Sequence, residues 1–169
     1  TELGIEGAID SKIYERLNDH MSDRDSVLNI VSETYFSLDI YLKKADREDL
    51  LALIIAGGWF EGLHLATKHL NDQTPELRQR IAEQKYAVDD LMKLLDSYEA
   101  NELLSSVKAD VAEMKAAFDA VEIKSGKSET STDESGTTVI GGSKEVIMSD
   151  EALVAISEKV TEIREKYIK

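Results

Sequence analysis

This chain of 169 residues has 34 acidic and 20 basic residues, which gives a formal net charge of -14. Nucleic-acid backbones and anionic membrane surfaces would repel such a chain, so we expect neither as a partner and favour a protein partner. The sequence contains no cysteine, which excludes disulfides, thiol catalysis and thiolate metal sites. A single proline and the lack of a spacer rich in glycine and proline predict one domain over residues 1–169.

Apolar residues at helical spacing predict helices from the beginning of the chain. A short helix is expected after Asp10 or Ser11, either of which can serve as its N-cap. A longer helix is predicted over residues 22–44, with Ser22 or Asp23 as the N-cap. Its apolar stripe alternates between steps of three and four residues and consists of Leu28, Val31, Tyr35, Leu38 and Leu42.

The next segment, residues 50–70, reads LLALIIAGGWFEGLHLATKHL and is apolar on nearly every side of a helix. A helix without a polar face belongs in the interior, so we predict that it is the central member of a bundle. Asp46 is the expected N-cap, with Asp49 as the acid of a capping box. Its longest apolar run, residues 50–60, is shorter than the roughly 20 residues that a membrane span needs, so we expect no span in this chain.

Three further helices follow. Thr74-Pro75-Glu76 predicts the start of the first of them, with Thr as the N-cap and Pro at the first helical position. The last two, the second of them capped by Ser149, are expected to form an antiparallel hairpin because both have apolar stripes in three-four alternation. The stripes consist of Leu104, Val107, Val111, Met114, Phe118 and Val121 in one helix, and Leu153, Ile156, Val160, Ile163 and Tyr167 in the other.

The predicted fold is therefore all-α, an antiparallel bundle of five to six helices with a central hydrophobic helix and a C-terminal helical hairpin. Residues 124–145, which are rich in Ser, Thr, Gly and charge, interrupt this hairpin and cannot bury a core of their own. We expect a flexible excursion there, with a small β-hairpin as the alternative. Gly126-Lys127-Ser128 resembles the end of a phosphate-binding loop, but Val121 stands where that motif needs a glycine.

The candidate binding residues lie together in the central helix: Gly57, Gly58, Trp59 and Phe60. Each glycine inside a helix costs about 1 kcal/mol relative to alanine, so the pair needs a reason. One interpretation is close packing against a neighbouring helix. The other is a small pocket bordered by Trp59.

Glu61 and His64 also belong to the candidate site, because Glu-x-x-His on a helix places both side chains on one face, as in di-iron bundles. Such bundles need a second motif of this kind, and the residues three before His20 and His69 are Leu17 and Ala66. We therefore predict no metal, no cofactor and no catalytic residue. A metal or phosphoryl site at Glu61 and His64 remains the alternative.

Residues 32–68, SETYFSLDIYLKKADREDLLALIIAGGWFEGLHLATK, together with residues 81–85, IAEQK, resemble an uncharacterised all-helical family of Bacteroidetes-type bacteria. Members of that family commonly begin with a lipoprotein-type signal. The resemblance implies that a signal and an anchoring cysteine precede Thr1, so that a lipid anchor lies upstream and the chain belongs to the bacterial cell envelope, on its periplasmic side or surface. A cytoplasmic location is the alternative.

These observations together predict a non-enzymatic binding or scaffold protein of the cell envelope that acts through helical surfaces. The prediction rests on the lack of a catalytic constellation in the sequence, on the acidity of the chain and on the resemblance.

Overall fold

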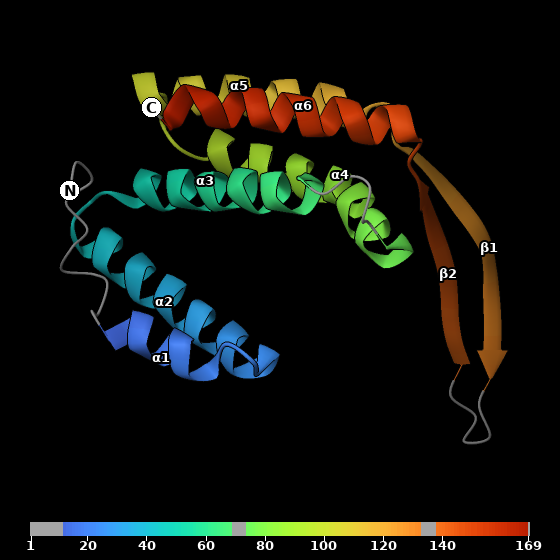
Figure 1. The fold of residues 1–169 in the computed structure, drawn as a ribbon, viewed down its shortest axis with the longest axis horizontal. Helices are drawn as coiled ribbons and strands as arrows, with labels where there is room; N and C mark the ends of the chain where they lie inside the picture. The colour runs from blue at the N-terminus through green and yellow to red at the C-terminus, as the bar shows by residue number, and fades with distance from the viewer. Residues whose placement is uncertain (1–11, 69–73, 133–137, 169) are drawn as a thin grey trace. The chain divides into compact units, whose positions relative to one another are not determined.

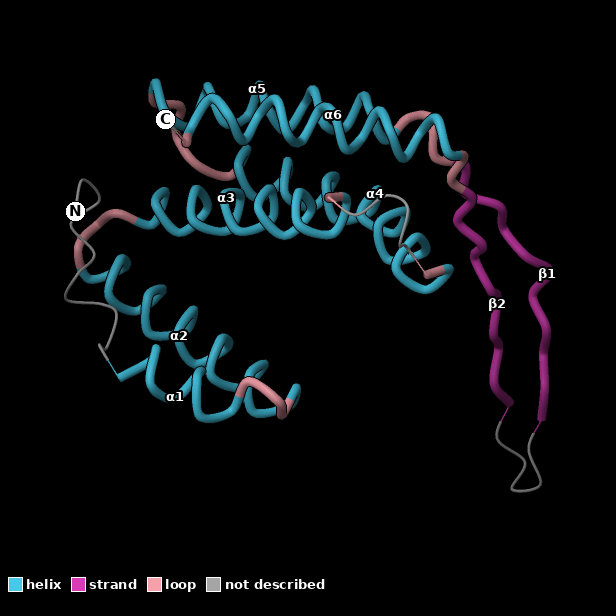
Figure 2. The backbone as a smooth tube through the Cα atoms, in the orientation of Figure 1, coloured by secondary structure: helices cyan, strands magenta, loops and turns pink. Residues whose placement is uncertain are grey.

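The computed structural model describes residues 12–68, 74–132 and 138–168, and Figures 1 and 2 show its elements. The described residues form six helices and one two-stranded antiparallel sheet, which confirms the predicted all-α bundle. In chain order the elements are α1 (Lys12–His20), α2 (Arg24–Lys44), α3 (Glu48–Thr67), α4 (Pro75–Asp96), α5 (Glu102–Phe118), β1 (Glu122–Thr132), β2 (Thr138–Ile147) and α6 (Asp150–Tyr167).

Contacts between residues divide the chain into two units, residues 1–55 and residues 56–169, where the sequence predicted a single domain. The boundary falls inside α3, between Ile55 and Ala56. No linker composition marks it, because one continuous helix crosses from the first unit into the second.

The first unit contains α1, α2 and the first residues of α3. Asp23 caps α2, as predicted, because its carboxylate accepts hydrogen bonds from the backbone N–H groups of the first turn. An ion pair of 2.8 Å between Arg16 and Glu33 joins α1 to α2. The predicted apolar stripe of α2 is buried only toward its C-terminal end, since Leu38 and Leu42 are buried whereas Leu28 and Val31 are exposed.

The prediction that Asp46 caps α3 is wrong. Asp46 has a positive φ of 51° and follows Ala45, the C-cap of α2. The N–H of Arg47 donates to the carbonyl of Leu42, which closes the end of α2 over Asp46. Aspartate tolerates this left-handed conformation better than most residues, so it ends one helix instead of beginning the next.

In the second unit, ion pairs between helices fix their directions. Residues 108 and 115 of α5 pair with residues 96 and 89 of α4, so α4 and α5 are antiparallel. Residues 159 and 166 of α6 pair with residues 113 and 110 of α5, which confirms the predicted antiparallel pair of long helices. Thr74 and Ser149 cap α4 and α6, as predicted.

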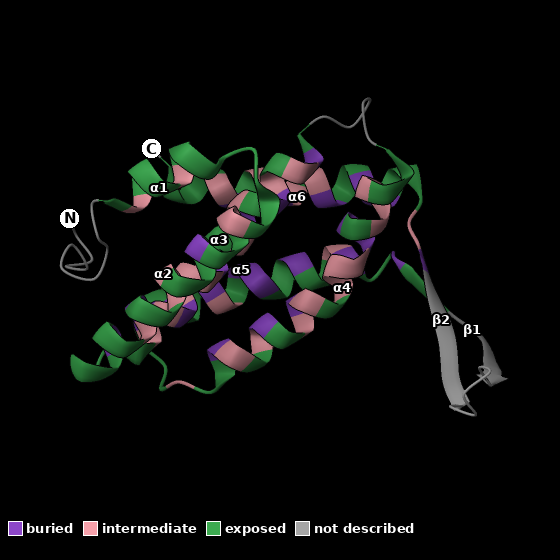
Figure 3. Ribbon diagram, turned by 90° about the horizontal axis from the view of Figure 1, so that it is seen from below, coloured by how far each residue is buried: buried purple, intermediate pink, exposed green. Residues whose placement is uncertain are grey.

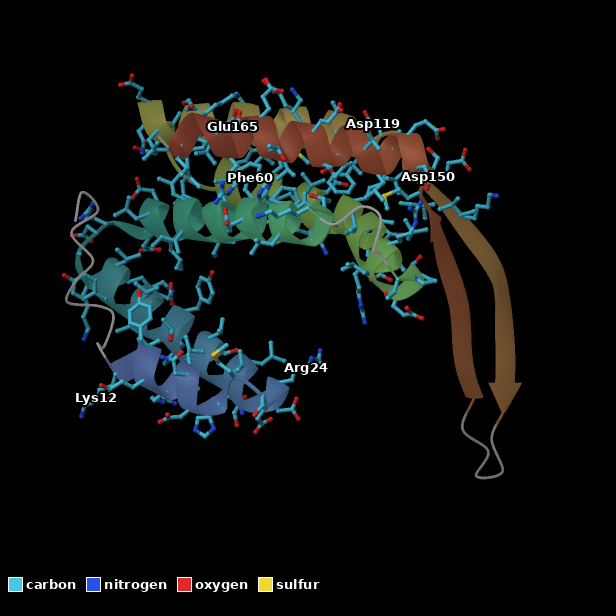
Figure 4. The ribbon with its side chains drawn as sticks, in the orientation of Figure 1. Lys12, Arg24, Phe60, Asp119, Asp150 and Glu165 are labelled. Atoms are coloured by element: carbon cyan, nitrogen blue, oxygen red, sulfur yellow. The ribbon has the colours of Figure 1, made fainter. Side chains whose placement is uncertain are left out.

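The core of this unit lies between the facing sides of α4, α5 and α6 (Figure 3). Every residue of the predicted α5 stripe is buried, and the α6 stripe is buried except at Tyr167. Phe60 of α3 also belongs to this core, because its side chain is buried between α3 and the helices α5 and α6 (Figure 4). Trp59 contacts both Phe60 and Phe118, with ring centroids 5.3 Å and 6.4 Å away.

α3 was predicted to be buried on all sides, but in the second unit it buries one side only. Ala56, Phe60, Leu63 and Thr67 are buried, whereas Gly57, Gly58 and Gly62 are exposed and Leu65 is 56% exposed. With 20 residues and a mean hydropathy of 1.5, α3 is long and apolar enough to cross a membrane. Core helices of soluble proteins meet the same criteria, so length and composition alone assign no span here.

The segment predicted to be a flexible excursion contains the β-hairpin that was the alternative. β1 and β2 pair antiparallel from Glu122 opposite Ile147 to Thr132 opposite Thr138. The register shifts between Ser125 and Ser128, so Gly126 and Lys127 form a bulge in a strand and not a phosphate-binding loop. Residues 133–137, at the tip, lie outside the described residues.

Candidate functional site

The six predicted site residues all lie on α3, but the structure places them in different surroundings. Gly58 and Trp59 line an open groove between α3 and α4. Phe60 is buried in the core, and Gly57 lies on the surface outside the groove. Glu61 and His64 contact α6.

The groove holds about 220 Å³ and opens to solvent. Its wall on α3 includes a row of small residues spaced four apart, with one aromatic and one leucine side chain beside them, and its wall on α4 consists of longer side chains. The lining residues are Gly58, Trp59, Gly62, Leu63 and Ala66 from α3 and Leu77, Arg80, Ile81 and Gln84 from α4.

The glycines leave this space open. A Cβ atom added at Gly62 would meet no atom within 4 Å, so no neighbouring helix fills the volume of the missing side chain. The same holds at Gly57. Close packing therefore does not explain Gly57, and the pocket interpretation agrees with Gly58, which lines the groove.

Gln84 has a role that the sequence pattern did not predict. It interrupts the apolar stripe of α4, and its side-chain oxygen accepts a hydrogen bond of 3.0 Å from the Trp59 indole N–H. Its own amide donates to the Arg80 carbonyl at 3.1 Å. The hydrogen bond from Trp59 to Gln84 gives the indole N–H its acceptor, and the apolar part of the ring lines the groove.

A row of polar contacts joins the other side of α3 to α6. Arg164 holds both oxygens of the Glu61 carboxylate, at 2.6 Å through Nε and 3.2 Å through Nη2. His64 Nδ1 lies 3.2 Å from the Thr161 hydroxyl. That hydroxyl donates its proton to the Ser157 carbonyl, so the imidazole must be the donor to Thr161.

The hydrogen bonds from Arg164 lower the pKa of Glu61, and the positive charges of Arg164 and Lys68 act in the same direction. The carboxylate is therefore ionised at neutral pH and engaged in a bidentate ion pair. Within residues 12–68, 74–132 and 138–168, no three His, Asp or Glu side chains come close enough to hold a metal ion. His69 lies outside these ranges.

Sequence reasoning missed one buried charge. Asp110 of α5 is only 3% exposed, and its carboxylate accepts hydrogen bonds from Lys166 at 2.6 Å and from the Tyr167 hydroxyl at 2.5 Å. Partial burial raises the pKa of Tyr167, and the bond to Asp110 adds to this shift. In the sequence, Asp110 is indistinguishable from the many acids on exposed helix faces.

A larger hollow of about 390 Å³ lies between α4 and the base of β2. Arg78 lines it, but its guanidinium is already paired with Asp150 at 2.7 Å and donates to the Met148 carbonyl at 3.3 Å. The α3–α4 groove instead combines open space with an apolar lining. We therefore treat it as the candidate site.

No family model matches this sequence, and neither a curated protein nor a solved structure shows significant similarity to the chain. A functional assignment therefore depends on what the residues of the groove can do.

Proposed function

We propose that this protein is a non-enzymatic binding protein whose α3–α4 groove holds the apolar face of a helix from a partner protein. The observation that supports this proposal is the row of Gly58, Gly62 and Ala66 beside the apolar side chains of Leu63 and Ile81. Leu63 and Ile81 are themselves buried, whereas the half-buried side chains of Trp59 and Leu77 give the lining its accessible apolar surface.

The geometry favours a helix as the ligand. Residues four apart on α3 follow one another along one side of the helix at about 6 Å intervals, so the small residues form a continuous strip about two turns long. A helix can approach such a strip closely and pack against it along its length. Leu65, which is 56% exposed beside Gly62, extends the apolar surface.

The chemistry of the groove favours apolar contacts. The indole N–H of Trp59 is already bonded to Gln84, and the Gln84 amide to the Arg80 carbonyl. Arg80 also lines the groove, and one of its guanidinium nitrogens is paired with Glu83 at 3.2 Å. Because these polar groups are already engaged, a ligand gains mainly from burial of apolar surface, at roughly 25 cal/mol per Å².

Two matched glycine variants test the proposal. Gly62→Leu places a side chain inside the groove, and Gly57→Leu places the same side chain on α3 outside it. Both positions have open space, and leucine is a better helix former than glycine by about 0.8–1 kcal/mol. We therefore expect both variants to be at least as stable as the parent protein in thermal unfolding.

The probe is an uncharged amphipathic peptide of Leu, Ala and Gln, which avoids non-specific attraction to the acidic protein. Trp59 is the only tryptophan and lines the groove, so its fluorescence reports binding. We expect saturable binding, weakened at least about tenfold by Gly62→Leu and unchanged by Gly57→Leu; a tenfold loss corresponds to about 1.4 kcal/mol. No binding to the parent protein, or equal loss in both variants, would contradict the proposal.

The cellular location is part of the same proposal and is supported by the resemblance to an exported helical family. Fractionation of the native cells tests it. We expect the full-length protein in the envelope fraction, released by detergent and not by salt, because a lipid anchor holds through apolar contacts. Recovery solely as a soluble cytosolic protein would contradict the envelope location without affecting the groove.

A further inference from the structure

The β1–β2 hairpin projects from the helices of the second unit as a two-stranded ribbon (Figure 1). Within the described residues no third strand pairs with either of its outer edges. Each edge therefore carries backbone N–H and C=O groups that can pair with another strand.

Among the described residues, contacts between the helices and the hairpin lie at its base. Val121 and Val146 are buried there, and the Lys85 ammonium donates to the Val121 carbonyl at 2.5 Å. Asp119 and Asp150, at the ends of α5 and α6, mark the point where the hairpin leaves the helices (Figure 4). A two-stranded ribbon beyond such a base is marginally stable by itself, whereas three or more strands are stable more readily.

The two edges are not equivalent. β1 contains the bulge at Gly126 and Lys127, and a bulge twists an edge away from further pairing. β2 has no inserted residue between Thr138 and Ile147. The edge of β2 is therefore the better acceptor for another strand.

We propose that β2 pairs antiparallel with β2 of a second copy of this chain, forming a four-stranded sheet in the order β1, β2, β2 of the second copy, β1 of the second copy. A two-fold axis perpendicular to the sheet relates the copies, so the interface uses the same residues on both. In such a symmetric pair, the numbers of two residues that stand opposite each other always add up to the same value. The sequence of β2 must therefore be complementary to its own sequence read in the opposite direction.

β2 matches itself when the axis passes through Ser143. Ile140 then stands opposite Val146 of the second copy, and by symmetry Val146 stands opposite Ile140, so apolar pairs flank the centre. Between them Lys144 stands opposite Gly142, and Glu145 opposite Gly141. Each charged residue therefore faces a glycine, and no like charges oppose each other, which favours pairing.

The neighbouring registers are poorer. An axis through Gly142 places Ile140 opposite Lys144 and Val139 opposite Glu145. An axis through Lys144 places two lysines directly opposite each other, which is unfavourable. The register centred on Ser143 is thus the one that the sequence of β2 supports.

Charge variants at Gly142 test both the dimer and its register. Gly142→Lys places lysine opposite Lys144 of the second copy, twice by symmetry, whereas Gly142→Glu places glutamate there. In the register of the hairpin, residues 142 and 144 pair with Ser128 and Ser125, which are uncharged residues. The two variants lose the same glycine and introduce long side chains of opposite charge.

Sedimentation equilibrium of the 169-residue chain measures the result. We expect a monomer–dimer equilibrium for the parent protein, with the dimer dissociation constant raised roughly 2- to 30-fold by Gly142→Lys and not raised by Gly142→Glu. A parent chain that stays monomeric up to about 1 mM, or equal weakening by both variants, would overturn the proposal.

Mixing two variants that each dimerise weakly shows whether the lost affinity comes from contacts between the copies or from a change within β2 of one copy. Gly142→Lys carries two lysines at positions 142 and 144, and Gly142→Glu combined with Lys144→Glu carries two glutamates there. Each alone should dimerise poorly, and an equimolar mixture should form a heterodimer because every lysine then faces a glutamate. If the mixture stays as weak as its components, the copies do not pair through β2.

Discussion

Replacing Phe118 with alanine is expected to lower the free energy of unfolding by about 3–5 kcal/mol, the usual cost of deleting a buried aromatic ring. Phe118 is fully buried at the end of α5, and its ring centroid lies 6.4 Å from that of Trp59. The cavity would open beside the single tryptophan. We therefore also expect the emission of Trp59 in the folded variant to move to longer wavelength.

Urea unfolding followed by circular dichroism gives the free energy, and α5 supplies a matched control pair. Leu104 is fully buried, whereas its neighbour Leu103 is 47% exposed. Leu104→Ala should cost about 2–5 kcal/mol, and Leu103→Ala should cost much less because little burial is lost. Equal effects at the two leucines would show that α5 packs through a different face.

Replacing Lys166 with methionine should destabilise the protein by about 3 kcal/mol, although Lys166 itself lies near the surface. The substitution removes the cation that pairs with the Asp110 carboxylate at 2.6 Å. The side chain of Asp110 is only 4% exposed, so water cannot replace the ammonium fully. The hydroxyl of Tyr167 would be the remaining strong donor to this carboxylate.

A second substitution shows whether the buried charge is the cause. In Lys166→Met combined with Asp110→Asn, no ionised carboxylate is left without a cation, so most of the lost stability should return. Thermal unfolding of the two single variants, the double variant and the parent at neutral pH gives the coupling between the residues. Additive effects would mean that the ion pair contributes nothing to stability.

Local signals in the sequence predicted the ends of several helices correctly. Asp23, Thr74 and Ser149 each cap a helix because a side-chain oxygen reaches a backbone N–H two or three residues further along the chain. That interaction depends on neighbouring residues alone. Asp46 shows the limit, since an aspartate that follows one helix and precedes another can serve either, and here it ends α2.

The sequence singled out two of the nine residues that line the groove, Gly58 and Trp59. Gly58 and Trp59 were singled out because glycines are costly within a helix, and both line the groove. Gly62, which was not among the predicted site residues, is a third glycine on the same helix and is equally evident in the sequence. Gln84 was noted as an interruption of a stripe, and its bond to Trp59 depends on a residue 25 positions away.

The sequence by itself determined the helical class, the caps and the buried stripes of α5 and α6, because periodicity and capping are short-range properties of the chain. The tertiary structure alone decided which side of α3 is covered, since an all-apolar helix has no polar face to show its orientation. It also decided which charges are paired. Glu61 with Arg164 and Asp110 with Lys166 lie far apart in sequence, and only packing of α6 against α3 and α5 brings them together.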